Sequence, residues 1–152
     1  MLLSARARTP RNALMLWIRR LNRRAPDGSM NIQEEFGIGE THATSRLAGP
    51  ATFDAAVDAI VSVVRRCVEN KVKRLLVDTT GLSGLKVPDV AQRYFRARKF
   101  SAAAGPGFKL VIVAVPAMID PQKFGVTAMA NDGVEANVFP TEAEAVAWLT
   151  AK

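Results

Sequence analysis

The run FKLVIVAV, residues 108–115, places the strongest constraint on how this chain folds. It is apolar throughout except for Lys109. A strand that is continuously apolar has to be covered on both faces, which is the usual situation of a parallel strand between two layers of helices. The sequence therefore predicts an α/β domain in which residues 108–115 form the innermost strand.

Apolar residues elsewhere recur with the two periods that distinguish strands from helices. The strands are expected over residues 31–38, 41–47, 72–78, 108–115 and 135–139, and the helices over residues 53–68, 88–100, 121–131 and 142–149. The order is β-β-α-β-α-β-α-β-α, in which the first two strands form a hairpin. Helix crossovers between the later strands predict a mixed, mostly parallel sheet with helices packed on it.

The predicted helices carry start signals, and the first strand has one exception. In that strand Ile32, Phe36 and Ile38 share a side that also contains Glu34, although Glu34 is charged. The expected helix starts are Thr52 as an N-cap, Pro88 as a first helical residue, Asp120 as a cap before Pro121, and a capping box of Thr141 and Glu144.

Positive charge is concentrated at the start of the chain. Residues 1–29 hold seven arginines against one acid, Asp27, whereas residues 30–152 hold 14 Lys and Arg against 13 Asp and Glu. We interpret residues 30–152 as the folded domain and residues 1–29 as a basic extension, disordered or spurious. Three explanations of the extension stay open: translation that begins at Met30, a tail that binds a surface, or a targeting leader.

Composition also limits the classes of function. The near-neutral charge of residues 30–152 does not indicate specific binding of nucleic acid. The apolar patch at residues 13–18 is too short to span a membrane, which takes about 20 residues. A single cysteine, Cys67, and a single histidine, His42, predict no disulfide, no metal site and no cofactor. These features favour a cytoplasmic protein in which Cys67 is an inert buried thiol.

Four stretches resemble the STAS class, the anti-sigma-factor antagonists and their relatives. They are SRLAGPATFDAAVDAI, RLLVDTTGLSG, KLVIVAV and NDGVEANVFPTEAEAVAWL, and the resemblance spans about residues 31–150. More particularly, the stretches resemble a group of small bacterial antagonist-like proteins of uncharacterised role. The resemblance implies a STAS-like fold, related to that of CRAL-TRIO-like lipid-binding domains. It also implies a non-enzymatic regulatory role with a protein partner, such as a kinase or a sigma factor.

The regulatory phosphorylation of that class has no counterpart in this sequence. Phosphoregulated antagonists carry an Asp-Ser-Ser-Gly-like sequence at the start of the helix that follows the strand and its aspartate. The equivalent turn here reads Lys86, Val87, Pro88 and Asp89, without a hydroxyl group. Asp89 supplies a fixed charge that satisfies the helix dipole and would repel a phosphate. The resemblance therefore implies an antagonist-like domain that lacks the usual phosphoacceptor serine.

The binding candidates fall where the strand at residues 72–78 ends and along the helix after it. Ligands bind open α/β sheets at the carboxyl ends of the strands, and a turn there uses the same side chains to satisfy its own amides. The helix carries Arg93, Arg96 and Lys99 along one stripe, which suits an acidic partner or an anionic head group unless it is simply a solvated helix face. The candidates are Asp78, Thr79, Thr80, Ser83, Asp89, Arg93, Arg96 and Met118.

Two functions remain open. The first is a non-enzymatic regulatory or protein-interaction domain. The second is a carrier or sensor of a small apolar or lipid ligand, for which Met118, Ile119, Tyr94 and Phe95 would line a pocket if they do not pack against one another. No nucleophile, base or carboxylate pair has a spacing that predicts an enzyme. The sequence leaves a homodimer open.

Overall fold

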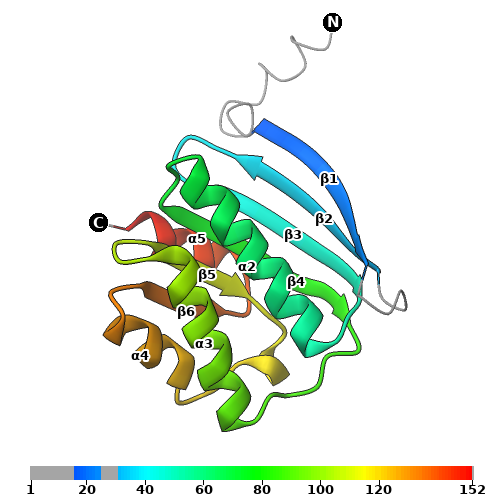
Figure 1. Cartoon of the computed structure of the whole chain (residues 1–152), viewed down its shortest axis with the longest axis vertical. Helices are drawn as coiled ribbons and strands as arrows, with labels where there is room; N and C mark the ends of the chain where they lie inside the picture. The colour runs from blue at the N-terminus through cyan, green and yellow to red at the C-terminus, as the bar shows by residue number, and fades with distance from the viewer. Residues whose placement is uncertain (1–15, 25–30, 152) are drawn as a thin grey trace, which may run out of the picture.

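The domain is a six-stranded sheet with helices on both faces (Figure 1). The computed structural model describes residues 16–24 and 31–151. Its elements in chain order are β1 (Leu16–Arg24), β2 (Asn31–Ile38), β3 (Ala43–Pro50), α2 (Phe53–Glu69), β4 (Arg74–Ser83), α3 (Val90–Ala104), β5 (Lys109–Val113), the 3-10 turn η2 (Pro116–Met118), α4 (Phe124–Asn131), β6 (Glu135–Phe139) and α5 (Glu142–Thr150). From β2 onward this is the predicted order.

The sheet is mixed and mostly parallel, as predicted. Its spatial order is β1-β2-β3-β4-β5-β6. The pairs β1·β2 and β2·β3 are antiparallel, and the pairs β3·β4, β4·β5 and β5·β6 are parallel. Helices α2 and α3 lie across one face of the sheet and α5 lies on the other (Figure 1). None of the helices in the described ranges is both long and apolar enough to cross a membrane.

Strand β1 departs from the sequence-based prediction. It lies within the extension that we expected to be disordered, yet it pairs with β2 from Leu16↔Ile38 to Arg24↔Asn31. The physical reason is that β2 would otherwise present a row of unpaired backbone groups at the edge of the sheet. The expected disorder is therefore wrong for residues 16–24. Residues 1–15 and 25–29 lie outside the described residues, and for them the prediction stays a prediction.

Strand β5 is covered on both faces, but it is not the innermost strand. Leu110 belongs to the core under α2 and α3, whereas Val111 and Val113 pack with Ala145 and Leu149 of α5. This alternation is the period of two along a strand. The central pair of the sheet is β3 and β4, and β5 lies one strand in from the β6 edge because the hairpin and β1 add strands only on the other side.

Helix α2 forms as the sequence predicted. The Thr52 hydroxyl accepts a hydrogen bond from the Ala55 amide at 3.1 Å, and Asp54 lies in the first turn. The buried side of the helix carries mostly β-branched and small side chains: Ala56, Val57, Ala59, Ile60, Val61, Val63, Val64 and Cys67. This amphipathic helix and the sheet beneath it make the larger of the two cores.

Two helices begin later than their prolines suggested. Asp89 is the N-cap of α3, so Pro88 lies outside the helix. Helix α4 begins at Phe124 because Lys123 has a left-handed backbone, with φ of 50°, which interrupts the turn that starts at Pro121.

The capping box of α5 is half formed. The Thr141 hydroxyl accepts from the Glu144 amide at 3.3 Å, as predicted. The Glu144 carboxylate, however, accepts from the Thr141 hydroxyl at 2.8 Å rather than from the Thr141 amide. Thr141 is nevertheless the N-cap, so the predicted start of this helix is confirmed.

Candidate functional site

A pocket opens between the sheet and the helices on the α2 and α3 face. Its volume is about 270 Å³, near the lower end of the roughly 300–1,000 Å³ of small-molecule sites. Its wall is mostly apolar and comes from several elements, with Ile60 of α2, Phe100 of α3, Leu110 and Ile112 of β5 and Met129 of α4 among the lining residues. A cavity of this kind suits a small ligand with apolar surface.

The rim of the pocket lies at the carboxyl ends of the parallel strands. Val87, from the segment after β4, and Val115 and Met118, from the segment after β5, contribute to it. Val87 is 57% exposed and Val115 is 44% exposed. This is the edge at which open α/β sheets bind ligands. Met118 therefore lies where the sequence suggested, whereas Tyr94 and Phe95 are exposed on α3 and do not line this pocket.

Strand β4 continues past the point where the sequence predicted a turn. Residues 79–83 are part of the strand, paired with β3 across a bulge between Arg46 and Ala48. Gly81 permits this because a Cβ at that position would stand 2.9 Å from the Leu47 carbonyl oxygen. The prediction of a turn after Asp78 is therefore wrong, and the side chains there alternate between the two faces of the sheet.

The alternation separates the candidates of β4. Thr79 faces the pocket, and its hydroxyl donates to the Val113 carbonyl oxygen at 2.8 Å. Asp78 accepts from the Thr80 amide at 2.9 Å and from the Thr80 hydroxyl at 2.7 Å. Asp78 also lies 3.5 Å from Arg46, whose guanidinium forms two hydrogen bonds to Glu142 of α5. Asp78 and Thr80 thus belong to the α5 side rather than to the pocket.

Ser83 and Asp89 also lie away from the pocket lining. Ser83 is exposed at the end of β4, where its carbonyl oxygen accepts from the Ala51 amide at 3.0 Å. The Asp89 carboxylate accepts from the Gln92 amide at 2.7 Å, and the Gln92 side chain accepts from the Asp89 amide at 3.0 Å. Asp89 thus caps α3 through its carboxylate and its backbone amide.

The basic residues of α3 do not form one solvated stripe. Arg96 lines the pocket, with its guanidinium carbon 5.8 Å from the centre of the Phe53 ring. Arg93 lies 3.9 Å from Asp120, and Lys99 lies 3.3 Å from Asp58 on α2. The expected basic face is therefore wrong. Helix packing turns Arg93 and Arg96 toward the segment before α4, and Lys99 pairs with Asp58.

That segment supplies polar groups that the sequence did not place in a site, since it marked Asp120 only as a helix cap. Asp120 and Lys123 both line the pocket. Asp120 accepts from the amides of Gln122, at 3.0 Å, and Phe124, at 2.8 Å. These hydrogen bonds, mainly the one to Phe124, hold the pKa of its carboxyl group below the ordinary value, and the charges of Arg93 and Arg96 act in the same direction.

Lys123 reaches across the end of β6. Its ammonium group donates to the Asn137 side-chain oxygen at 2.6 Å and to the Val138 carbonyl oxygen at 3.3 Å. It also lies 5.1 Å from the centre of the Phe139 ring. No periodic pattern marks Lys123 or Asn137 in the sequence, and only their positions after β5 and within β6 could have suggested this edge.

The remaining reactive side chains are structural. Burial raises the pKa of the Cys67 thiol to about 12, so it stays protonated at neutral pH. Burial also lowers the pKa of His42, which contacts the Thr41 hydroxyl at 2.8 Å. Within residues 16–24 and 31–151, no three His, Cys, Asp or Glu side chains are grouped so that they could hold a metal ion.

Comparison with known proteins identifies the fold. No protein-family model and no curated protein matches this sequence. An anti-sigma factor antagonist from Mycobacterium paratuberculosis matches with a TM-score of 0.53 and 14% identity, over 85% of this chain and 100% of that chain. An uncharacterized protein from the DUF3478 family with a SpoIIAA-like fold, from Shewanella loihica PV-4, matches with a TM-score of 0.44 and 16% identity, over 90% of this chain and 95% of that chain. The predicted STAS-like fold is confirmed.

Proposed function

We propose that this STAS-like chain is a non-enzymatic regulatory domain that binds a small apolar ligand in the pocket between its sheet and helices α2, α3 and α4. The observation that carries the proposal is the pocket itself. It holds about 270 Å³ in a wall that is mostly apolar, and it opens at the carboxyl ends of the parallel strands. Covering that apolar wall with a ligand would remove it from water, which favours binding of a molecule with apolar surface.

The polar groups of the pocket favour binding over chemistry. Thr79 donates to the β5 backbone, Asp120 accepts from the amides before α4, and Lys123 donates to β6. These hydrogen bonds hold the backbone in place, and among the described lining residues none joins a nucleophile to a base. An apolar pocket with a few fixed polar groups is typical of a ligand-binding site.

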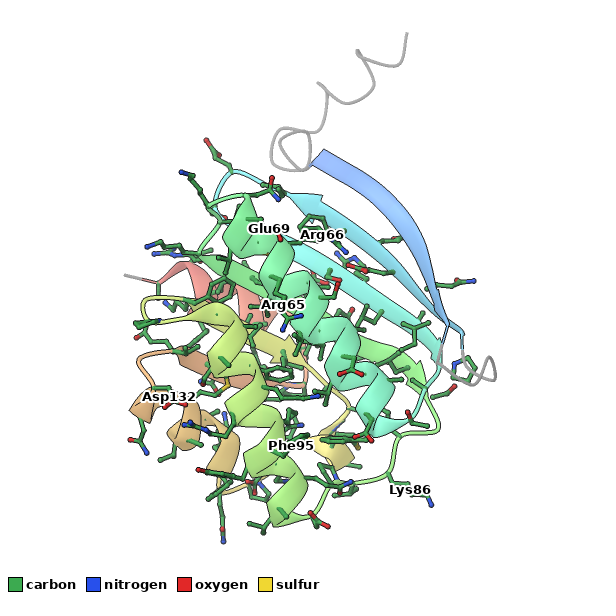
Figure 2. All side chains as sticks on the ribbon, in the orientation of Figure 1. Arg65, Arg66, Glu69, Lys86, Phe95 and Asp132 are labelled. Atoms are coloured by element: carbon green, nitrogen blue, oxygen red, sulfur yellow. The ribbon has the colours of Figure 1, made fainter. Side chains whose placement is uncertain are left out.

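The regulatory part of the proposal rests on the surface beside the pocket. Exposed apolar side chains lie on the segment before α3 and on the outer side of that helix, where Figure 2 labels Phe95. The exposed fractions are 57% for Val87, 61% for Val90, 50% for Tyr94 and 55% for Phe95. Grouped exposed apolar residues are typical of protein-interaction surfaces. Val87 belongs both to this surface and to the pocket rim, so a bound ligand would change the surface that a protein partner contacts.

Phosphorylation is not part of the proposed regulation. The position that resembles the phosphoacceptor turn holds Asp89, which already accepts from the Gln92 amide. A phosphate there would be repelled by the negative charge of the Asp89 carboxylate. In this proposal the ligand takes the place of the phosphate as the signal, in the cytoplasm of a bacterial cell.

Ligand titration of the full 152-residue chain tests the proposal. We expect isothermal titration calorimetry to detect one site for at least one of two probes, octanol and octanoate. Val126→Trp places a large side chain in the lining and should abolish that binding. Ala130→Trp makes the same change at an exposed position of α4 that does not line the pocket, and it should bind like the parent chain.

The contrary result is equally clear. If neither probe binds, or if both tryptophan variants bind like the parent chain, the pocket is not a ligand site.

The partner surface has its own test, in which the double variant Val90→Ser with Phe95→Ser should fail to capture a protein that the parent chain captures from its native host. Identical captures by the two chains would exclude this surface.

A further inference from the structure

The charged groups of the pocket are unbalanced. Two cations, Arg96 and Lys123, and one carboxylate, Asp120, line it. A third cation, Arg93, lies 3.9 Å from the same carboxylate. Among the described residues, the pocket and its edge therefore hold three positive charges and one negative charge. An apolar cavity with this excess of cations is complementary to a ligand that carries a negative charge.

Within the part of the chain that the structure describes, Asp120 and Lys123 have hydrogen-bonding partners and Arg96 has none. The Asp120 oxygens accept from two backbone amides, and Lys123 donates to Asn137 and to Val138. Among the described residues, the Arg96 guanidinium forms no hydrogen bond or ion pair. It makes a cation–π contact with the Phe53 ring. Its donors are therefore available to a ligand.

Burial makes this arrangement costly without a ligand. Burial lowers the pKa of Arg96, the charge of Arg93 acts in the same direction, and only Asp120 opposes them. The Nε atom of Arg93 is also buried, and it has no hydrogen-bond partner among the described residues. A cation out of water and short of partners is unfavourable unless an anion or an acceptor meets it. An anionic group placed against Arg96 would remove that penalty.

There is space for such a group beside Arg96. Gly125, the second residue of α4, lines the pocket, and a Cβ at this position would stand 3.6 Å from the Arg96 Nη2 atom. That distance is ordinary van der Waals contact, so the glycine leaves the guanidinium uncrowded on this side, and the space for a head group is the pocket that Arg96 itself lines. The apolar part of the pocket, including Phe100 and Leu110, continues from the same wall.

We propose that the ligand of this pocket is a small amphiphile with one anionic head group and a short hydrocarbon body, and that Arg96 binds the head while the apolar wall encloses the body. The inference rests on the proposed function and names its ligand class. A guanidinium binds carboxylate or phosphate oxygens with two parallel hydrogen bonds, so either oxyanion fits. Lys123 adds a second positive charge to the pocket lining.

Calorimetric titration of the full chain with three probes of equal chain length tests this class. We expect octanoate or octyl phosphate to bind at least about tenfold tighter than octanol, since hydrogen bonds to a charged group are worth more than those to a neutral one. The order of the two anionic probes distinguishes a carboxylate ligand from a phosphate ligand. Equal affinity for all three probes would overturn the anionic head group and leave the apolar pocket standing. Binding of none would overturn both.

Variants at position 96 test the residue. Arg96→Met keeps an unbranched side chain without charge, and it should weaken binding of the anionic probe by about tenfold to a hundredfold while leaving octanol unchanged. Arg96→Lys should recover part of the loss because it restores the charge without the second hydrogen bond. The matched control is Lys99→Met, which removes a cation of the same helix that pairs with Asp58 outside the pocket.

The control variant should bind every probe like the parent chain. Thermal unfolding of each variant shows whether it is folded, and the comparison of probes on the parent chain stands even where a variant is not. An Arg96→Met chain that binds the anionic probe as tightly as the parent chain would overturn the role of Arg96.

Discussion

Glu34 shows at the scale of a residue how one position can depart from a pattern without disturbing the fold. It occupies the apolar side of β2 and is fully buried. Arg66 donates to its carboxylate at 2.9 Å, and Ser45 donates at 3.1 Å. The guanidinium of Arg66 also lies 4.7 Å from the centre of the Phe36 ring. A buried charge is tolerated because a cation and a hydroxyl meet it inside the core.

Removing one partner of this pair should be costly. Glu34→Gln leaves the Arg66 guanidinium without its carboxylate, and we expect the free energy of unfolding in urea to fall by about 3 kcal/mol. The double variant Glu34→Leu with Arg66→Met removes both charges and should lie within about 1 kcal/mol of the parent chain. A double variant as unstable as Glu34→Gln would contradict this account.

The control for that measurement lies on the same helix. Glu69 is exposed near the end of α2, where Figure 2 labels it together with Arg66. Glu69→Gln makes the same chemical change without breaking a buried pair, so the free energy of unfolding should change by no more than about 0.5 kcal/mol.

At the scale of an element, helix starts depend on which side chain reaches the free amides. Threonine caps predicted two starts well, since Thr52 and Thr141 accept from the amides three residues on. Proline was a weaker guide. Proline fits the first position of a helix, but its presence does not make a helix begin there. After Pro121, the left-handed backbone of Lys123 delays the start of α4 until Phe124.

The start of α4 should make stability depend on pH. The pKa of Asp120 is lowered in the folded state, mainly by the Phe124 amide. Its contribution to stability is therefore fully present above the ordinary value of 3.8 and is lost as the pH falls through the lowered folded value. Asp120→Ala should lower the free energy of unfolding by about 1 kcal/mol at neutral pH, and the difference from the parent chain should shrink as the pH falls below 3.8.

A second substitution at this position separates charge from hydrogen bonding. Asparagine still accepts from the two amides but carries no charge, so Asp120→Asn should keep most of the stability at neutral pH and lose the acid dependence. Urea unfolding at a series of pH values measures both variants. An unchanged difference between Asp120→Ala and the parent chain across this range would show that the carboxylate does not act through its charge.

At the scale of the whole molecule, β1 changes which strand lies at the edge of the sheet. It occupies the outer side of β2, which the hairpin prediction had left as an edge. Exposed edges favour pairing with another chain. The homodimer that the sequence left open stays a prediction. Two copies that paired edge to edge on this side of the sheet would pair through β1 rather than through β2.

A chain that begins at Met30 should behave differently from the full chain. Without residues 1–29 the backbone groups of β2 are unpaired on one side, so we expect a lower unfolding temperature and greater self-association. Thermal unfolding and sedimentation velocity at several concentrations measure the two effects. If the shorter chain matches the full chain in both, β1 contributes nothing to the fold, and the domain boundary that we predicted at Met30 would be supported.

Much of the architecture follows from local sequence. Residues 31–38, 53–68 and 135–139 form the predicted elements within a residue or two, because periodicity and caps are properties of neighbouring residues. The burial of β5 on both faces follows from the apolar run 108–115 in the same way. Its position one strand in from the edge does not, because that depends on which strands join the sheet elsewhere.

The residues that line the pocket are brought together by tertiary packing. Thr79 lies on β4, Arg96 on α3, and Asp120 and Lys123 on the segment before α4, and no spacing in the sequence relates these three places. Strand alternation turned Asp78 away from Thr79, and the packing of α3 turned Arg96 inward. The order of strands and helices can be predicted from the sequence, because hydrophobic pattern and capping act over a few residues. The pocket and its charges were decided by packing between distant segments, which a local pattern does not record.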